Sequence, residues 1–398
     1  MVKTYLRYAE EAAWGVVASG GGGVAVDASG KLALSPALEA VAVWNIKTGA
    51  LVRKLQPTGV IAAEVTALEL AADSDTLAVG YSNGSILLWR LSDATERVTL
   101  NGHKSAVTSL HFNPGVTLLI SGARDTNVVV WDVVAEAGIC RLRGHKDAVT
   151  DVCMLPKHNA IASVSKDGML RLWDLDTQHC IQTIAAPSGE LWSVAADGAD
   201  ERLITGGANA ELLVWQLVVK SLSKAHPGRA GAPDIAYNLQ AMAEADKADA
   251  DWRGVQAVQL GPLIVRASQA RVARLRFGVD DSLVAVQFAD KNLQLYSVQS
   301  EAQLEKQLKR RAAKRRKRAS GETDEVAAQD EEDIAPSLSA ADCYQPLTCG
   351  APARCASLTP VGNQVPTCVC LSYVLQAPPR VAQASFICIH AACWARPR

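Results

Sequence analysis

Apolar residues along the chain gather in short runs, and a similar run recurs at nearly constant spacing. Five of these runs end in tryptophan. The tryptophans are Trp44, Trp89, Trp131, Trp173 and Trp215, at intervals of 45, 42, 42 and 42 residues. A sixth run, Leu293–Tyr296, ends in tyrosine 81 residues after Trp215, which is one repeat plus about 39 residues. The sequence therefore predicts six repeats.

Each repeat divides into apolar or alternating stretches that are too short for helices. Ala106–Phe112 is followed by the turn residues Asn113–Gly115 and then by the next stretch, Thr117–Ser121. Such runs, bounded by Gly, Asn, Asp or Pro, are typical of strands, and no helical period lies between Val41 and Val219. We predict an all-β fold in which each repeat is one four-stranded propeller blade.

Two repeats contain the same four side chains at the same separations of 18, 4 and 6 residues. The two sets are His103, Ser121, Asp125 and Trp131, and His145, Ser163, Asp167 and Trp173. With Gly102 before the first histidine, Gly144 before the second, and an Asp after each tryptophan, these repeats resemble the WD40 family over roughly residues 14 to 300. The resemblance implies that each set forms a hydrogen-bonded chain inside its blade, which leaves few buried polar atoms unpaired.

The other repeats keep less of this pattern. Asn83, Thr205, Asn209 and Asp290 stand at the family spacing, whereas Leu38 occupies the turn position of the first repeat. Six repeats are recognisable where the resembling proteins build seven, so we expect an incomplete, open or strained ring. Six-bladed closure is the alternative, because propellers of different blade number exist.

Composition changes sharply outside the repeats. We expect a WD40 β-propeller over residues 1–300 with a mobile insertion at 221–254 between the fifth and sixth blades, followed by a basic and then acidic linker at 301–333. The basic part, from Ser300 to Arg318, has helix-forming composition. The Cys- and Pro-rich tail, 334–398, has no persistent strand or helix period, and we expect it to be disordered and to supply no blade.

Charge is balanced overall, with 40 basic and 41 acidic residues, but it is unevenly placed. One basic group predicts a nuclear or nucleolar address or contacts with RNA phosphates, with a solvated segment as the alternative. It comprises Lys309, Arg310, Arg311, Lys314, Arg315, Arg316, Lys317 and Arg318. A second group, in loops of adjacent blades, predicts a basic end that binds acidic segments or RNA, with scattered surface charge as the alternative. It comprises Lys104, Arg124, Lys146 and Lys166.

Motifs for chemistry are missing from the sequence. The glycine run Gly20–Gly23 lacks the Lys and Ser or Thr of a phosphate-binding loop, and the seven tail cysteines lack the paired Cys-x-x-Cys spacing of zinc sites. Charged residues interrupt the N-terminus where a secretory signal would be apolar, and no apolar run is long enough to span a membrane. We therefore predict no catalytic residue, cofactor, metal, small-molecule substrate or membrane contact.

Two binding functions remain, and the residues favour one of them. A ubiquitin-ligase substrate receptor commonly has an Arg two residues after the Asp of Trp-Asp, where this chain has Val134 and Asp176. In contrast, Tyr5–Tyr8, Leu77–Tyr81 and Trp173–Cys180 resemble the N-terminal propellers of WD40 subunits of the small-subunit processome. That resemblance implies a non-enzymatic nucleolar scaffold in U3 snoRNA-dependent pre-rRNA processing. Its partners would be processome proteins and, directly or indirectly, U3 snoRNA or pre-rRNA.

Overall fold

A computed structural model describes the propeller and two short stretches that follow it. The described ranges are 22–27, 29–57, 63–187, 189–220, 254–263, 265, 268–278, 281–290, 292–299, 343–347, 357–361 and 364–369. Within the two last ranges the description is limited to the backbone. All statements below concern these residues.

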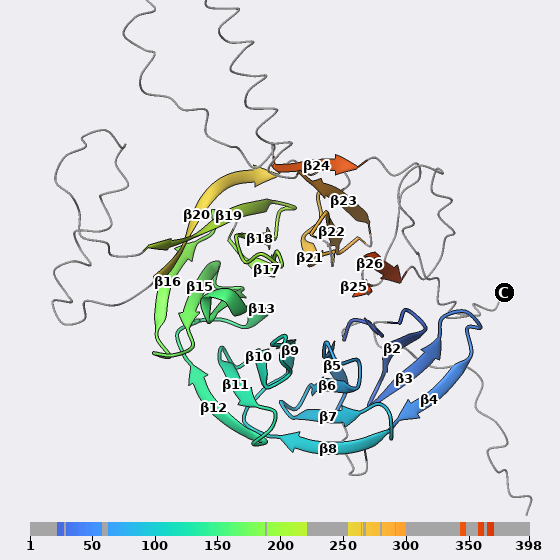
Figure 1. Cartoon of the computed structure of the whole chain (residues 1–398). Helices are drawn as coiled ribbons and strands as arrows, with labels where there is room; N and C mark the ends of the chain where they lie inside the picture. The colour runs from blue at the N-terminus through green and yellow to red at the C-terminus, as the bar shows by residue number, and fades with distance from the viewer. Residues whose placement is uncertain are drawn as a thin grey trace, which may run out of the picture.

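Six four-stranded antiparallel sheets follow one another along the chain and are arranged as blades around a central channel (Figure 1). In every blade the first strand is innermost and the fourth is outermost. Blade 1 contains β1 (Ala25–Val26), β2 (Leu32–Ala37), β3 (Ala40–Asn45) and β4 (Leu51–Leu55). Blade 2 contains β5 (Val65–Leu70), β6 (Thr76–Tyr81), β7 (Ile86–Arg90) and β8 (Thr95–Leu100). Blade 3 contains β9 (Val107–Phe112), β10 (Leu118–Ala123), β11 (Val128–Asp132) and β12 (Ala137–Leu142).

The remaining three blades continue the same order. Blade 4 contains β13 (Val149–Leu155), β14 (Ala160–Ser165), β15 (Met169–Asp174) and β16 (Cys180–Ala185), with a short 3₁₀ turn, Pro156–His158, between its first two strands. Blade 5 contains β17 (Leu191–Ala196), β18 (Arg202–Gly207), β19 (Leu212–Lys220) and β20 (Gly254–Leu263). Blade 6 contains β21 (Val272–Phe277), β22 (Leu283–Phe288), β23 (Leu293–Val298) and β24 (Tyr344–Leu347).

The hydrophobic core lies between neighbouring blades. Side chains on one strand alternate between the two faces of a sheet, so a blade with apolar residues at successive positions can pack on both neighbours. Between blades 3 and 4, for example, Ile120 and Val130 pack with Val152, Ile161 and Trp173, and all five side chains are buried. Each blade therefore depends on the blades beside it for the burial of its apolar faces.

The structure corrects the place of the expected insertion at 221–254. Lys220, at the end of β19, pairs with Gly254, at the start of β20, so the additional residues interrupt blade 5 rather than separate it from blade 6. The tryptophan of each of the first five repeats lies in the third strand of its blade, and the fourth strand of blade 5 follows the insertion. Residues 301–342 similarly fall between β23 and β24, inside blade 6. The basic segment expected to be helical lies outside the described residues.

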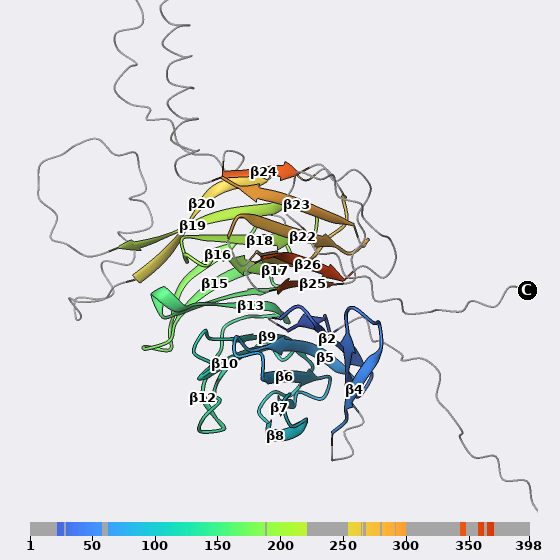
Figure 2. The same cartoon turned by 45° about the vertical axis from the view of Figure 1, so that its right-hand side comes forward.

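The tail also differs from expectation, because it contains strands. Tyr344–Leu347 forms β24, and β25 (Ser357–Val361) pairs with β26 (Gln364–Val369) in a separate two-stranded sheet. Strand β25 contacts β21 of blade 6 and β1 of blade 1, and β26 contacts β22. Both views show this hairpin beside blade 6, and Figure 1 shows it between blades 6 and 1 (Figures 1 and 2). The expectation of a disordered tail is therefore wrong for these strands, although the described part of the tail forms no complete blade.

The ring consequently has a seventh position that is half filled by the described residues. Two strands occupy it where the other positions have four, and these two strands stand between blade 1 and blade 6. The prediction of an all-β, incomplete propeller is confirmed, whereas six-bladed closure is not the observed arrangement. No helix in the described part of the chain has the length and apolar character needed to cross a membrane.

The hairpin formed by β25 and β26 should stabilise the ring. Ending the chain after residue 350 exposes the sides of β21 and β1 that face the hairpin. We expect the midpoint of thermal unfolding to fall by at least about 5 °C, because a decrease of about 2 kcal/mol in the free energy of unfolding shifts the midpoint of a domain of this size by this order. We also expect self-association to increase, because apolar surface becomes exposed. Calorimetry and light scattering measure both effects. A chain ending after residue 372 retains both strands and is the control, and equal behaviour of the two truncations would contradict the role of the hairpin.

Candidate partner-binding face and central channel

A chain of hydrogen bonds crosses blade 3 through the first of the two predicted sets. The Trp131 Nε1 donates to Ser121 Oγ at 2.8 Å, Ser121 Oγ lies 2.7 Å from His103 Nε2, and His103 Nδ1 lies 3.2 Å from the Asp125 carboxylate. Asp125 also accepts the backbone N–H groups of Lys104 at 2.9 Å and Asn127 at 3.1 Å. These contacts fasten the turn between β10 and β11 to the loop before β9.

Blade 4 repeats this geometry almost without change. Trp173 Nε1 donates to Ser163 Oγ at 2.8 Å, His145 Nε2 lies 2.8 Å from the same oxygen, and His145 Nδ1 lies 3.0 Å from Asp167. The backbone N–H of Lys146 donates to Asp167 at 2.9 Å. The structure thus brings together all eight side chains of the two sets.

Burial and hydrogen bonding together determine the protonation states in these two chains of hydrogen bonds. Burial is the largest influence on His103 and His145, and it lowers the pKa of both imidazoles despite the opposing effect of Asp125 and Asp167. For the two carboxyls, burial acts to raise the pKa, but backbone N–H donors and the histidines outweigh it and hold the pKa below its ordinary value. Each chain therefore runs from indole N–H to hydroxyl to neutral imidazole to carboxylate.

The weaker repeats contain parts of this chain that the sequence pattern missed. In blade 1, Trp44 Nε1 donates to Ser35 Oγ at 2.9 Å, across nine residues instead of ten because the turn is shorter. In blade 6, Ser268 Oγ donates to Asp290 at 2.7 Å and takes the place of the histidine, at the same separation of 22 residues. Thr205 accepts from Trp215 Nε1 at 2.9 Å, as its spacing indicated.

The four lysines and arginines predicted to form a basic end do lie on one face of the ring. Lys104 and Lys146 belong to loops that enter an innermost strand, and Arg124 and Lys166 to turns between second and third strands, which meet at the same face. Exposed carboxylates share these loops and turns. They are Glu39, Glu64, Asp147, Glu190, Glu211 and Asp290. The face is therefore mixed in charge at its periphery, and its partner binding stays a prediction.

Positive charge is concentrated where the central channel opens on this face. A cavity of about 550 Å³ lies there, and four cationic side chains line it: Arg124, Lys166, Arg271 and Arg274. Threonines of the innermost strands form part of its wall, and no carboxylate belongs to its described lining. Arg271 and Arg274 were not singled out by sequence reasoning, because the insertion in blade 5 conceals their alignment with the other repeats.

Trp192 stands at the edge of this cavity and holds two of the cations. The Lys166 Nζ lies 4.6 Å from the centre of its ring, and the Arg271 guanidinium carbon lies 3.7 Å from a ring centre. Such distances are typical of cation–π contacts. Because the two cations come from the blades on either side of Trp192, the indole fixes them at the cavity wall.

Deeper in the channel, hydroxyl and carboxylate groups join the blades to one another. Asp151 accepts from Ser109 Oγ and from Ser193 Oγ, both at 2.7 Å, and Ser193 Oγ accepts the backbone N–H of Leu275 at 3.0 Å. These bonds run from blade 3 to blade 6. A second series lies nearer the mouth, where Thr66, Thr108 and Thr150 each donate to a backbone carbonyl of the next blade at 2.6 to 2.8 Å.

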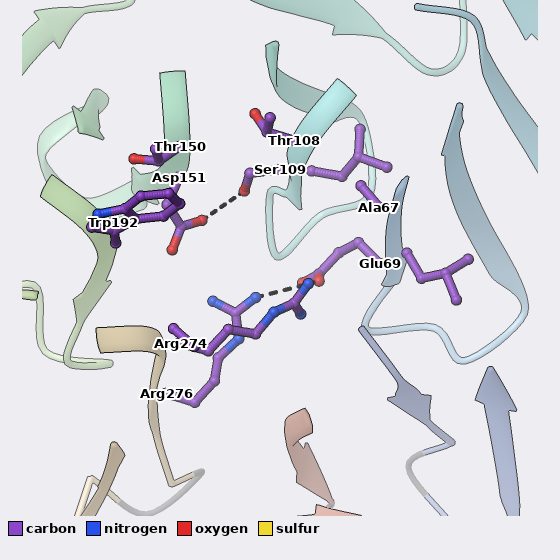
Figure 3. A pocket seen from close by; sticks show the side chains of 12 residues that line it. Ala67, Glu69, Thr108, Ser109, Thr150, Asp151, Trp192, Arg274 and Arg276 are labelled. Carbon is purple, nitrogen blue, oxygen red and sulfur yellow. Dashed lines mark hydrogen bonds and ion pairs between the residues drawn. The ribbon is translucent and has the colours of Figure 1, made fainter. Parts of the chain in front are cut away.

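An ion pair crosses the channel from blade 6 to blade 2. Arg276 lies 3.8 Å from Glu69, as Figure 3 shows with a dashed line, and the space that remains beside them is about 40 Å³. Burial acts to lower the pKa of Arg276, but Glu69 and Asp151 outweigh it and raise the pKa above its ordinary value. The middle of the channel is therefore filled and neutralised, unlike its mouth.

Several predicted features cannot be placed. Residues Lys309 to Arg318 and the cysteines Cys349, Cys355, Cys370, Cys388 and Cys393 lie outside the described residues. Cys343 is buried beside β24, and the side chain of Cys368 is not described. The described residues contain no group of three or more His, Cys, Asp or Glu side chains suited to a metal ion.

Comparison with known proteins agrees with this architecture. The chain has the fold of a WD40-type β-propeller. Residues 31–217 match the family model described as the WDR3 first beta-propeller domain. The matched range runs from blade 1 through the third strand of blade 5, where the first insertion begins.

Three curated relatives share part of this region. The U3 small nucleolar RNA-associated protein 12 of Saccharomyces cerevisiae is 43% identical over 141 residues, which cover 31% of this chain and 15% of that protein. The WD repeat-containing protein 3 homolog of Dictyostelium discoideum is 37% identical over 27% of this chain and 11% of its own length. The human WD repeat-containing protein 3 is 35% identical over 23% and 10%. The chain thus matches a small part of each relative.

Two solved structures share the fold at low identity. The crystal structure of the RRP9 WD40 repeats superposes on this chain with a TM-score of 0.52 and 19% identity. The superposition covers 69% of this chain and 76% of the RRP9 chain. The structure of U3-55K has a TM-score of 0.51, with the same identity and coverage. These likenesses establish the propeller fold.

Removing the carboxylate from either complete hydrogen-bond chain should destabilise the propeller. Asp125→Ala and Asp167→Ala each leave two backbone N–H groups and an imidazole N–H without their acceptor, so we expect each to lower the free energy of unfolding by roughly 1–3 kcal/mol. Chemical denaturation measures the change. Glu211→Ala, in an exposed turn of blade 5, is the control. Unfolding of either Asp variant at wild-type denaturant concentration would rule out this role.

The same chains predict a loss of stability in acid. His103 and His145 have a lowered pKa in the folded state, so the unfolded chain binds protons first as the pH falls below about 6.5, and folding becomes less favourable. The lowered pKa of Asp125 and Asp167 adds a further loss below about pH 4. Melting curves between pH 7.5 and 5 measure the first effect. The double variant His103→Asn/His145→Asn should show a flatter dependence in that range; an unchanged slope would contradict this explanation.

Proposed function

We propose that this chain acts as a non-enzymatic scaffold subunit of the small-subunit processome, in U3 snoRNA-dependent processing of pre-ribosomal RNA. The observation that carries the proposal is the 43% identity, over 141 residues, to a protein named as U3 small nucleolar RNA-associated. The match of residues 31–217 to the WDR3 first propeller supports it. The solved structures contribute the fold alone.

The chemistry of the propeller fits a scaffold better than a catalyst. Its conspicuous acid–base groups, His103 with Asp125 and His145 with Asp167, are occupied by hydrogen bonds that fasten turns to loops. Asp151 in the channel is likewise held by two serine hydroxyls and two backbone N–H groups. The function of the chain therefore resides in the surfaces that it offers to other molecules.

Two basic groups are the proposed contacts for those molecules. Lys104, Arg124, Lys146 and Lys166 would contact processome proteins or RNA phosphates at the loop face. The run from Lys309 to Arg318 would direct the chain to the nucleus and retain it in the nucleolus through contacts with RNA. If the side chains of both groups bind phosphate, this chain contacts RNA directly at these residues.

The test is recovery of U3 snoRNA with the tagged full chain from a eukaryotic cell. Replacing Lys104, Arg124, Lys146 and Lys166 by Glu should reduce the recovery of U3 snoRNA at least about tenfold, because four reversed charges repel the phosphates that the wild-type side chains would attract. Replacing Arg315, Arg316, Lys317 and Arg318 by Gln should shift the chain to the cytoplasm, as seen by microscopy.

A matched control reverses four exposed lysines outside the face, namely Lys31, Lys47, Lys54 and Lys157. Unreduced recovery with this control shows that net charge alone is not responsible. Failure of the wild-type chain to recover U3 snoRNA would refute the processome role, and equal losses in the two charge-reversal variants would refute the face. Nucleolar signal that survives loss of the four basic residues would refute the address.

A further inference from the structure

An apolar groove lies between blades 1 and 2, at the face of the ring opposite to the channel mouth. Its volume is about 280 Å³. Leu34, Val43, Val52 and Leu55 of blade 1 line one side, and Leu91 of blade 2 belongs to the other side. The outermost strands of the two blades, β4 and β8, are neighbours at the lower right of Figure 1. Turns that lead into second and fourth strands form the rim of the groove.

An arginine leaves this space open. In blades 2 and 3, one position of the fourth strand is held by Val98 and Cys140, and each packs on the core between its own blade and the next. Blade 1 has Arg53 at the equivalent position. The Arg53 guanidinium donates to the backbone carbonyl of Leu91 at 3.0 Å. The side chain therefore spans the groove without filling it.

Val52 extends the apolar wall of the groove to the solvent. It is the additional residue of a β-bulge in the pairing of β3 with β4, and a bulge redirects a side chain. The equivalent bulge residues of blades 4 and 5, Ile181 and Leu260, pack on the core that their blade shares with the next one. Val52 is 55% exposed. The described residues thus leave uncovered an apolar position that two other blades cover.

Charge at the rim favours a basic occupant. Asp27 of blade 1 and Asp75 of blade 2 belong to the lining, and Arg53 is the one cation of the described lining. Arg90 lies 3.9 Å from Asp75 and 3.8 Å from Asp93, so one cation serves two carboxylates. The exposed lysines of blade 1 lie outside the lining. The rim therefore keeps negative charge on both sides of the apolar wall, which attracts cations.

We propose that this groove binds an extended segment of a partner polypeptide in which leucine or isoleucine is flanked by lysine or arginine. The aliphatic side chain enters beside Val52 and Leu55, and the flanking cations pair with Asp27 and Asp75. A cavity of roughly 150 Å³ admits a benzene-sized group, so the volume of about 280 Å³ suffices for the aliphatic side chain. Concave apolar sites with few polar groups are typical of binding sites.

This assignment goes beyond the proposed function and does not depend on it, because the groove can be tested with the purified full chain. The probe is a fluorescently labelled peptide with Lys-Leu-Leu-Lys between Gly-Ser flanks. One comparison peptide has serine in place of both leucines, and the other has glutamate in place of both lysines. Anisotropy at physiological ionic strength should show saturable binding of the probe.

Each comparison peptide should bind at least about tenfold more weakly, because the first lacks the apolar anchor and the second is repelled by the rim. Equal affinity of the serine peptide would show that charge alone attracts the probe and would overturn the groove as the site. Equal affinity of the glutamate peptide would overturn the choice of a basic partner.

The variant Val52→Trp fills the groove and should weaken probe binding at least about tenfold. The matched control is Ile139→Trp, at the equivalent bulge position of blade 3, which is 49% exposed and lies outside the groove. Its affinity should stay within about twofold of the wild type. Both variants should melt as the wild type does, because both positions are exposed. Equal losses of affinity in the two variants would refute the site.

The rim is tested separately, with a variant that keeps the groove open. Asp27→Asn/Asp75→Asn should weaken probe binding and reduce its dependence on salt, because two carboxylates of the lining are neutralised. Glu136→Gln/Asp176→Asn removes the same charge from exposed turns of the same face and is the control. Equal affinities of the two double variants would refute the pairing of the probe with Asp27 and Asp75.

Two further measurements identify the place and the occupant. A probe with a diazirine analogue of leucine should crosslink on irradiation to segments that contain Val52 or Leu91, as mass spectrometry identifies them. Crosslinks confined to other blades would refute the site. Sedimentation of the free chain should show a monomer. A dimer that Val52→Trp dissociates would assign the groove to a second copy of this chain and refute the proposed partner.

Discussion

The rest of the structure depends on the packing of each blade against two others. A sheet with apolar side chains on both faces is stable in water when both faces are covered, and a circular array meets this condition at every position if the ring closes. The buried clusters between blades, such as the one around Ile120 and Trp173, are the result. Hydrogen bonds from Thr66, Thr108 and Thr150 to the next blade satisfy polar atoms at the inner edge. The same constraint explains why β25 and β26 stand between blades 6 and 1.

The sequence predicted the features that recur in every repeat, and it did not predict those that differ between repeats. Tryptophan spacing identified five of the blades, and the separations of 18, 4 and 6 residues identified two complete hydrogen-bond chains. Because the tryptophan run is the last recognisable part of each repeat, an insertion after it was assigned to the gap between blades, although it lies before the fourth strand of the same blade. The hairpin of β25 and β26 has no such aromatic marker. Its short strands could not be distinguished from an unstructured tail.

The candidate pocket was missed for a different reason. The repeat determines where a side chain lies but not which residue type occupies the position. Trp192 occupies the position that Thr66, Thr108 and Thr150 occupy in the preceding blades, and these residues follow one another at intervals of 42; such a set of equivalent positions is called a column below. An aromatic residue that interrupts a column of threonines was a visible signal at the channel. Arg274 and Arg276 fall in the columns of Asp151 and Cys153, displaced by the insertion in blade 5. Without the place of that insertion, their alignment with the channel could not be deduced.

The two long interruptions of the propeller also separate its surfaces. Both follow the third strand of a blade, after Lys220 in blade 5 and after Val298 in blade 6, and such turns lie at the end of the strands opposite to the channel mouth. The basic run from Lys309 to Arg318 is therefore joined to the chain on the face away from Arg124, Lys166 and Trp192. The loop face and the face at which both interruptions begin are opposite surfaces of one ring. A molecule that lies flat on one of these surfaces therefore does not cover the other.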